Sequence, residues 1–233
     1  MLPQIPLGIS LRESASFDSF VGLGNQRTLA DIKACIAKSG ENYLYLWGPD
    51  GTGKSHLLQA GCRAAQSESC RVAYIPLSQA DHFSPEILEE LGILDLICLD
   101  DIQRVSGIPA WEMALFRLFN QLREGGSRLI VSADRPPASL HVRLADLRSR
   151  LEWGLCCQLN LLDDPARLQL LTESAHRRGL VLPEGTARYI LSHTARDTQA
   201  LVELMDRLDL ASLSAQRRLT IPFVKTILER DGA

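Results

Sequence analysis

Short, continuous apolar runs alternate with helical periodicity over the first two thirds of the chain. Each apolar run is bounded by turn residues, which is typical of strands buried on both faces. The predicted strands are Tyr43–Trp47, Arg71–Pro76, Leu94–Leu99, Arg128–Ser132 and Leu155–Leu159. The predicted helices are Asn25–Lys38, Lys54–Ala65, Pro85–Leu91 and Trp111–Arg123. Strands that alternate with helices predict an α/β fold with a doubly wound, parallel, five-stranded sheet.

Beyond Leu162 the strand pattern ends and only helical periodicity remains. The predicted helices there are Pro165–Arg178, Pro183–His193, Thr198–Leu213 and Ile221–Glu229. We therefore predict an α/β domain over residues 13–162 and a small all-α domain over residues 163–233. Residues 1–12 contain two prolines and a glycine and follow neither period, which predicts an extended tail.

Composition narrows the class of protein. Hydrophobic residues make up 45% of the chain, and the net charge of −3 argues against bulk nucleic acid as its main partner. No apolar stretch is long enough for a membrane span and the start lacks a signal-peptide pattern, so we expect a cytoplasmic protein with no membrane partner. The six cysteines show no C-x-x-C spacing and are expected to be buried, reduced thiols, and the three tryptophans are expected to pack in the core or at its edge.

One segment matches the phosphate-binding pattern G-x-x-x-x-G-K-[ST] between a predicted strand and a predicted helix. Its residues are Gly48, Pro49, Asp50, Gly51, Thr52, Gly53, Lys54 and Ser55. Glycines let backbone N–H groups surround phosphate oxygens, and the following helix N-terminus favours an anion. We expect Lys54 to contact the β- and γ-phosphates of ADP or ATP and Ser55 to ligate Mg²⁺.

Two carboxylates, Asp100 and Asp101, follow the apolar run Leu96–Leu99. They are predicted at the carboxyl edge of the sheet, where open α/β folds bind ligands. Asp100 would then hold Mg²⁺, and Asp101 would polarise an attacking water. The alternative is a surface turn with two helix-capping acids.

Charged residues also lie between the last two predicted strands. Asp134 would lie at the γ-phosphate edge as a sensor, although Asp134–Pro137 would also make a good turn. Arg148 and Arg150 stand just before the last strand. In oligomeric P-loop ATPases an arginine at this place stabilises the transition state in a neighbouring subunit. A solvated basic turn is the alternative.

Several stretches in order resemble the AAA+ ATPases, and more closely the DnaA-related proteins of the Hda family. They are Phe17–Val21, Tyr43–Trp47, Asp134–Pro137, Ser149–Gly154 and Leu219–Lys225, which together extend over essentially the whole chain. The resemblance implies an AAA+ domain with a helical lid. It also implies an ADP-bound regulator that, on the DNA-loaded sliding clamp, stimulates hydrolysis of DnaA-bound ATP and so prevents a second initiation of replication.

The same resemblance assigns roles to further residues. Arg150 matches the arginine finger that acts in trans, and Phe20, Val21 and Leu23 resemble the apolar segment near the nucleotide base. The lid helix of the family offers an arginine as a second sensor, whereas this chain has Gln199 there and Arg196 one turn earlier. We therefore expect weak or no intrinsic ATPase activity.

The tail resembles the clamp-binding peptide of the family, with a frayed terminus as the alternative. Its residues are Gln4, Ile5, Pro6, Leu7, Gly8 and Ile9. The chain ends soon after Glu229, so we expect no dedicated DNA-binding domain, and a homo-oligomer stays open.

Two other classes of function remain. One is an autonomous ATPase or loader that remodels a replication partner, and the other is a DNA-binding adaptor, which the acidic composition disfavours.

Overall fold

The computed structural model describes residue 11 and residues 15–21, 24–89, 91–194, 198–215 and 218–231. The chain divides into two compact units, residues 1–160 and 161–233.

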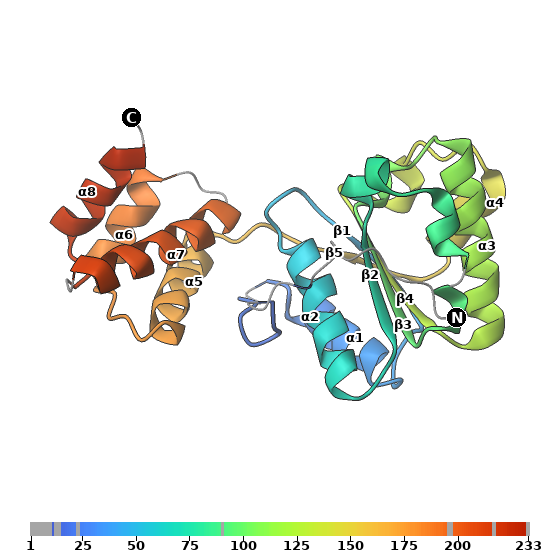
Figure 1. The fold of residues 1–233 in the computed structure, drawn as a ribbon, viewed down its shortest axis with the longest axis horizontal. Coiled ribbons are helices and arrows are strands. Elements are labelled where there is room, and N and C mark those ends of the chain that lie inside the picture. The colour runs from blue at the N-terminus through green and yellow to red at the C-terminus, as the bar shows by residue number, and fades with distance from the viewer. Residues whose placement is uncertain are drawn as a thin grey trace. The chain divides into compact units, whose positions relative to one another are not determined.

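The first unit is a parallel sheet with helices on both faces (Figure 1). Its strands are β1 (Tyr43–Trp47), β2 (Val72–Pro76), β3 (Leu96–Asp100), β4 (Arg128–Ala133) and β5 (Leu155–Gln158). They pair in the order β2-β3-β4-β1-β5, all parallel. Its α-helices are α1 (Gln26–Ile36), α2 (Lys54–Ser67), α3 (Pro109–Gly125) and α4 (Ala145–Glu152). The predicted five-stranded parallel sheet is confirmed.

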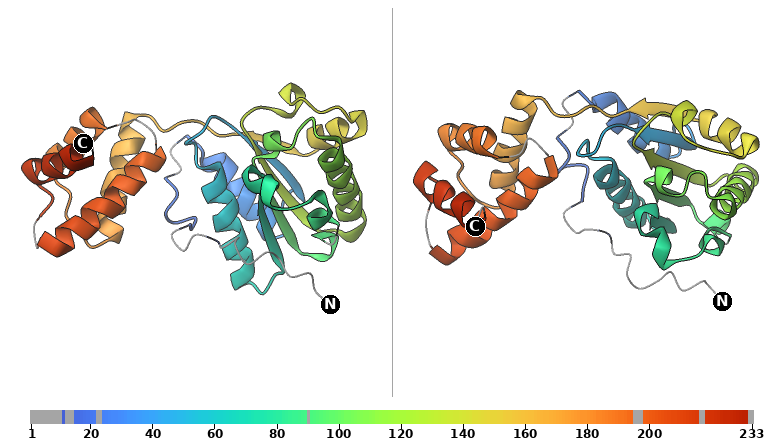
Figure 2. Two further views of the ribbon diagram at one scale, coloured as in Figure 1. Left: turned by 45° about the horizontal axis from the view of Figure 1, so that its top comes forward. Right: turned by 90° about the horizontal axis from the view of Figure 1, so that it is seen from above.

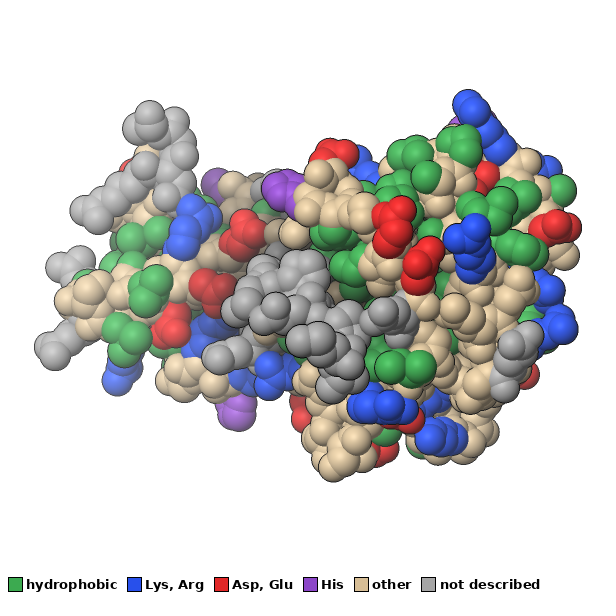
Figure 3. Space-filling model, turned by 45° about the vertical axis from the view of Figure 1, so that its right-hand side comes forward, with side chains coloured by type: hydrophobic (Ala, Val, Ile, Leu, Met, Phe, Trp, Pro, Cys, Tyr) green, Lys and Arg blue, Asp and Glu red, His purple; other side chains and the backbone are tan. Residues whose placement is uncertain are grey.

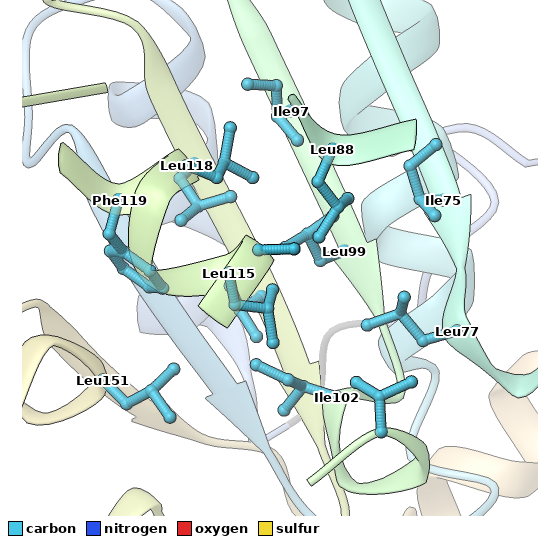
Figure 4. Close-up of a cluster of buried hydrophobic side chains, with 14 of the residues drawn as sticks. Ile75, Leu77, Leu88, Ile97, Leu99, Ile102, Leu115, Leu118, Phe119 and Leu151 are labelled. Carbon is cyan, nitrogen blue, oxygen red and sulfur yellow. The ribbon is translucent and has the colours of Figure 1, made fainter. Parts of the chain in front are cut away.

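Successive strand residues point to opposite faces, so the buried strands contribute side chains to two apolar clusters. Leu44 and Leu46 of β1 pack with α1 and α2, whereas Tyr45 between them packs with α3 and α4. Figures 1 and 2 show these helix pairs on opposite sides of the sheet. In Figure 4 side chains of α3 lie against Ile97 and Leu99 of β3, with Leu151 of α4 at the margin. Both faces are therefore covered, as the continuous apolar runs require.

One local prediction and one alternative are wrong. The predicted helix Pro85–Leu91 is absent from the described residues, which form two 3₁₀ turns, η2 (Pro85–Leu88) and η3 (Leu91–Ile93). This short run buries Leu88 and Leu91 and is followed by Gly92. The residues around Arg148 and Arg150 are not a turn but the helix α4. Only Leu147 and Leu151 of α4 are buried, so the apolar period is too weak to reveal it.

The second unit is all-α, as predicted. It contains α5 (Asp164–Arg177), α6 (Glu184–His193), α7 (Thr198–Ala215) and α8 (Ile221–Asp231), packed around a core of its own that includes Leu171, Ile190, Met205 and Val224. Asp163 caps α5 by accepting a hydrogen bond from the Ala166 N–H at 2.9 Å.

The six cysteines are free thiols. Cys35, Cys62, Cys98 and Cys157 are buried as predicted. The prediction fails for Cys156, which is exposed because β5 lies at the edge of the sheet, and Cys70 is only partly buried. Within the described residues, no three His, Cys, Asp or Glu side chains gather as a metal cluster would require.

Candidate functional site

The P-loop lies between β1 and α2, and its shape depends on glycine. A Cβ on Gly48 would lie 2.4 Å from the backbone oxygen of Leu159, so no side chain fits there. Gly53 has φ of +89° and precedes α2 as its N-cap. Only glycine adopts this left-handed conformation at low cost. The loop can therefore turn sharply from the strand into the helix.

Lys54 is the first residue of α2, and it is 5% exposed. Its ammonium donates to the backbone oxygens of Gly48 at 2.8 Å and Pro49 at 2.9 Å. The ammonium also lies 3.9 Å from the carboxylate of Asp50, whose side chain is 98% exposed. A buried cation satisfied by neutral carbonyls, at a helix N-terminus, attracts an anion such as a phosphate.

Asp100 ends β3 and is 3% exposed. Tyr74 of β2 donates its hydroxyl to Asp100 Oδ2 at 2.6 Å, and Ser132 of β4 donates to Oδ1. Gln59 of α2 in turn donates to the Tyr74 hydroxyl at 3.1 Å. The carboxylate is thus fixed by its neighbouring strands, and it is not a capping acid at a surface turn.

Asp101 adopts a left-handed conformation with φ of 62°. Its N–H donates to Ser132 Oγ at 2.8 Å and its carboxylate accepts from Gln103 Nε2 at 3.0 Å. Burial raises the pKa of Asp101, and the Asp100 charge raises it further. A left-handed aspartate held on both its backbone and its side chain is typical of a functional edge.

Asp134 follows β4 and forms a two-pronged ion pair with the adjacent Arg135, at 2.8 and 2.7 Å. These hydrogen bonds lower the pKa of Asp134. The Gly48 N–H at the start of the P-loop donates to the backbone oxygen of Ala133 at 3.3 Å, and β4 lies between β1 and β3. The P-loop lysine and the predicted acids therefore meet at one edge of the sheet, with Asp134 directed to Arg135.

The segment that leads into α1 lies against the P-loop. A Cβ on Gly53 would lie 2.8 Å from the Phe20 ring, which also stacks on His56 with ring centres 6.1 Å apart. His56 Nε2 lies 2.9 Å from the backbone oxygen of Ser16, and Val21 is buried. Phe20 is therefore placed beside the loop, and the contact of Phe20 and Val21 with a base stays a prediction.

Arg150 lies in α4, half-buried, with its guanidinium 6.0 Å from the centre of the Trp153 ring. Trp153 is 61% exposed, so the prediction that the tryptophans pack in the core or at its edge is wrong for this residue. Over the described ranges, no carboxylate lies within 4 Å of the Arg150 guanidinium. Arg148 is exposed and donates to the backbone oxygen of Val142. Arg150 therefore lies beside an aromatic ring and forms no ion pair with a described residue.

Several predicted residues lie outside the described part of the chain or in the second unit. Leu23, Arg196 and residues 4–9 lie outside the described part of the chain. Gln199 lies in α7 of the second unit and donates to Glu203 one turn further on, at 2.9 Å. The sensor and clamp-binding roles stay predictions.

Sequence reasoning missed Tyr74 and Ser132, which hold Asp100. Both are polar residues inside otherwise apolar strand runs. A buried hydroxyl needs a hydrogen-bond partner, and that requirement was the available signal.

The surface carries charge of both signs. On the face drawn in Figure 3, basic and acidic side chains are interspersed and do not gather by sign. Among the described helices, none is both long and apolar enough to cross a lipid bilayer.

The strand order, the P-loop after β1, the carboxylates after β3 and the helical second unit define a P-loop protein of the AAA+ class. Residues 11–158 match the model of the bacterial DnaA ATPase domain, and residues 164–228 match that of the Hda lid domain. The chain belongs to the DnaA-related family of AAA+ proteins, with a lid of the Hda type.

The chain is also similar to individual proteins and solved structures. A Haemophilus influenzae protein without an assigned function is 42% identical over 229 residues, which are 98% of this chain and 99% of that protein. AMPPCP-bound DnaA from Aquifex aeolicus is 26% identical with a TM-score of 0.77, covering 96% of this chain and 72% of that one. Domain III of Thermotoga maritima DnaA has a TM-score of 0.79 at 24% identity, covering 96% and 98%, and shows the fold alone.

Proposed function

We propose that this chain is a regulatory nucleotide-binding AAA+ protein that, with the sliding clamp, stimulates hydrolysis of DnaA-bound ATP and so prevents re-initiation of DNA replication. The observation that carries the proposal is Arg150, presented on α4 beside exposed Trp153 in a chain of the DnaA-related family with an Hda-type lid. A guanidinium without a carboxylate partner among the described residues is suited to a phosphate on another molecule.

The chain's own P-loop is proposed to bind ADP or ATP. The Aquifex aeolicus neighbour holds AMPPCP, and Lys54 here offers a buried ammonium to phosphate oxygens. Ser55 and Asp100 are hard oxygen donors, which fit Mg²⁺. Mg²⁺, when bound, neutralises charge on the phosphate oxygens. Tyr74 and Ser132 keep the Asp100 carboxylate oriented toward that role.

Arg150 acts in trans on the nucleotide of DnaA. Its planar guanidinium donates to oxygens of the γ-phosphoryl group, where negative charge redistributes in the transition state. An arginine finger contributes roughly 10³- to 10⁵-fold in rate in P-loop NTPases. The nucleotide of this chain then sets its conformation and is not the fuel.

The tail, residues 4–9, is proposed to bind the clamp. Pull-down of the clamp by the full chain and by a chain lacking residues 1–9 tests this part, and equal recovery would remove the tail from the proposal.

Reconstitution tests the function. DnaA loaded with ATP is mixed with DNA-loaded clamp, ADP and this chain, and ADP formation is followed. We expect stimulation that requires every component, is lost in Arg150→Ala and is retained in Arg117→Ala, which removes an exposed arginine of α3. Stimulation that survives Arg150→Ala would contradict the trans mechanism.

A second candidate is intrinsic ATP hydrolysis, which the held geometry of Asp101 favours. Steady-state turnover of the purified chain distinguishes the two functions. Substantial turnover that is lost in Asp101→Asn would support an autonomous ATPase.

A further inference from the structure

Glu112 is a buried carboxylate that the candidate site does not use. It lies in the first turn of α3 and is 2% exposed. Across the described residues, no lysine, arginine or histidine lies within 4 Å of it. A buried carboxylate without a cation requires strong hydrogen-bond donors, and among the described residues these are backbone N–H groups.

Three backbone N–H groups donate to Glu112. Gly107 N lies 2.8 Å from Oε1, Arg143 N lies 2.9 Å from Oε1 and 3.1 Å from Oε2, and Leu144 N lies 2.8 Å from Oε2. The donors come from two separate segments. Gly107 follows the 3₁₀ turn η4 (Ile102–Arg104) that continues from Asp101, and Arg143 and Leu144 lead into α4.

The helix α4 needs such an external anchor. It has 8 residues and its N-cap is Leu144, which has no side-chain acceptor for the first N–H groups. Helices this short are marginal by themselves, so tertiary contacts must hold them. Leu147 and Leu151 bury one face in the core, and the Tyr43 hydroxyl donates to the Leu151 backbone oxygen at 3.2 Å at the other end.

We propose that Glu112 is a positioning residue for Arg150. Its carboxylate fixes the start of α4 on the segment that follows the Asp100 and Asp101 carboxylates, so the guanidinium is presented at a defined place relative to the sheet edge. The catalytic consequence rests on the proposed function, whereas the structural consequence for α4 does not.

Glu112→Gln is the variant that tests this role. Glutamine has nearly the same shape but a single acceptor oxygen. Its amide N–H₂ would therefore face backbone N–H groups that donate to the carboxylate in the parent chain. Asp95→Asn is the matched control, because Asp95 Oδ2 also accepts a backbone N–H, that of Arg71 at 2.9 Å, at the other end of the strands. Binding of ADP shows whether each variant is folded. If Glu112→Gln does not bind ADP, Glu112→Asp takes its place.

A double-mutant cycle on DnaA-bound ATP hydrolysis separates positioning from general destabilisation. We expect Glu112→Gln to lower the maximal stimulated rate by about tenfold, with the affinity for ADP within about twofold, and to have no further effect in an Arg150→Ala background. An equal loss in both backgrounds, or no loss in the parent, would overturn the proposal.

Hydrogen exchange tests the structural step independently of any activity. Glu112→Gln should raise exchange in peptides covering residues 143–153 while the β3 and β4 peptides keep the parent rates, and Asp95→Asn should leave α4 unchanged. Uniformly raised exchange, or unchanged exchange in α4, would overturn the proposal. If the parent chain fails to stimulate DnaA at all, the proposed function fails, and this exchange pattern alone decides the role of Glu112.

Discussion

The P-loop and α4 place their cationic side chains by different means. Lys54 donates to the backbone oxygen of Gly48, so the loop is held largely by contacts within itself. Arg150 lies on a short helix whose two ends are held by Glu112 and Tyr43, side chains distant in the chain. The loop should therefore tolerate changes elsewhere in the unit, whereas α4 should respond to changes that never touch Arg150.

The largest effect on ADP binding is expected when the P-loop itself is changed. Lys54→Ala removes a buried ammonium aimed at phosphate oxygens, and we expect a loss of about 2–3 kcal/mol, roughly 30- to 150-fold, in affinity for ADP. Titration of a fluorescent ADP analogue measures the loss. Lys225→Ala, which removes an exposed lysine of α8, is the control and should bind as the parent does.

A change at the far end of α4 should disturb that helix and spare the P-loop. A Cβ on Gly154 would lie 2.1 Å from the Tyr43 ring, so Gly154→Ala must displace that ring or the residues after α4. We expect a stability loss of about 1–3 kcal/mol in urea unfolding, with ADP affinity unchanged.

Gly185→Ala is the matched control, because a Cβ on Gly185 meets no atom within 4 Å. Alanine is favoured over glycine inside a helix, so this variant should be neutral or slightly more stable. Equal destabilisation by the two glycine variants would contradict the account of α4.

The exposed ring of Trp153 supports Arg150 by a cation–π contact, which the P-loop lysine lacks. Loss of this cation–π contact should cost about 0.5–1 kcal/mol, which corresponds to roughly two- to fivefold in stimulated DnaA hydrolysis. Trp153→Ala should show the loss and Trp153→Phe should keep most of the rate. A similar loss in both variants would remove the ring contact from the account.

The smallest effect on stability is expected at the Asp134–Arg135 ion pair, which follows β4. The hydrogen bonds from Arg135 lower the pKa of Asp134 in the folded chain, so their stabilisation is present above the ordinary aspartate range and is lost as pH falls through the lowered pKa. Arg135→Ala should therefore melt slightly below the parent at pH 7, and the gap should close below about pH 4. A gap that widens in acid would contradict this sign.

Much of the nucleotide edge could be predicted from the sequence, because its parts are local. The strand ahead of Gly48 and the strand ahead of Asp100 are continuous apolar runs, and parallel strands bring their carboxyl ends to one edge. Composition and period also predicted the helical second unit, whose amphipathic helices pack on one another.

The remainder depends on contacts between distant residues. Glu112 looks like any acid in the first turn of a helix, and only the fold brings it to the N–H groups of Arg143 and Leu144. The helix α4 itself escaped prediction because two leucines among polar residues make a weak period. The helix predicted at Pro85–Leu91 is wrong for a different reason, since this stretch buries Leu88 and Leu91 in 3₁₀ turns without forming a regular helix.

Single-turnover hydrolysis shows whether Arg150 acts on the ATP of DnaA. DnaA carries ATP labelled in its γ-phosphate, this chain carries unlabelled ADP, and release of labelled phosphate in a single turnover is followed on DNA-loaded clamp. Hydrolysis should be fast with the parent chain and should fall at least about a hundredfold with Arg150→Ala, while ADP affinity of the variant stays that of the parent. Equal rates with the parent chain and with Arg150→Ala would contradict action of Arg150 on the partner's ATP.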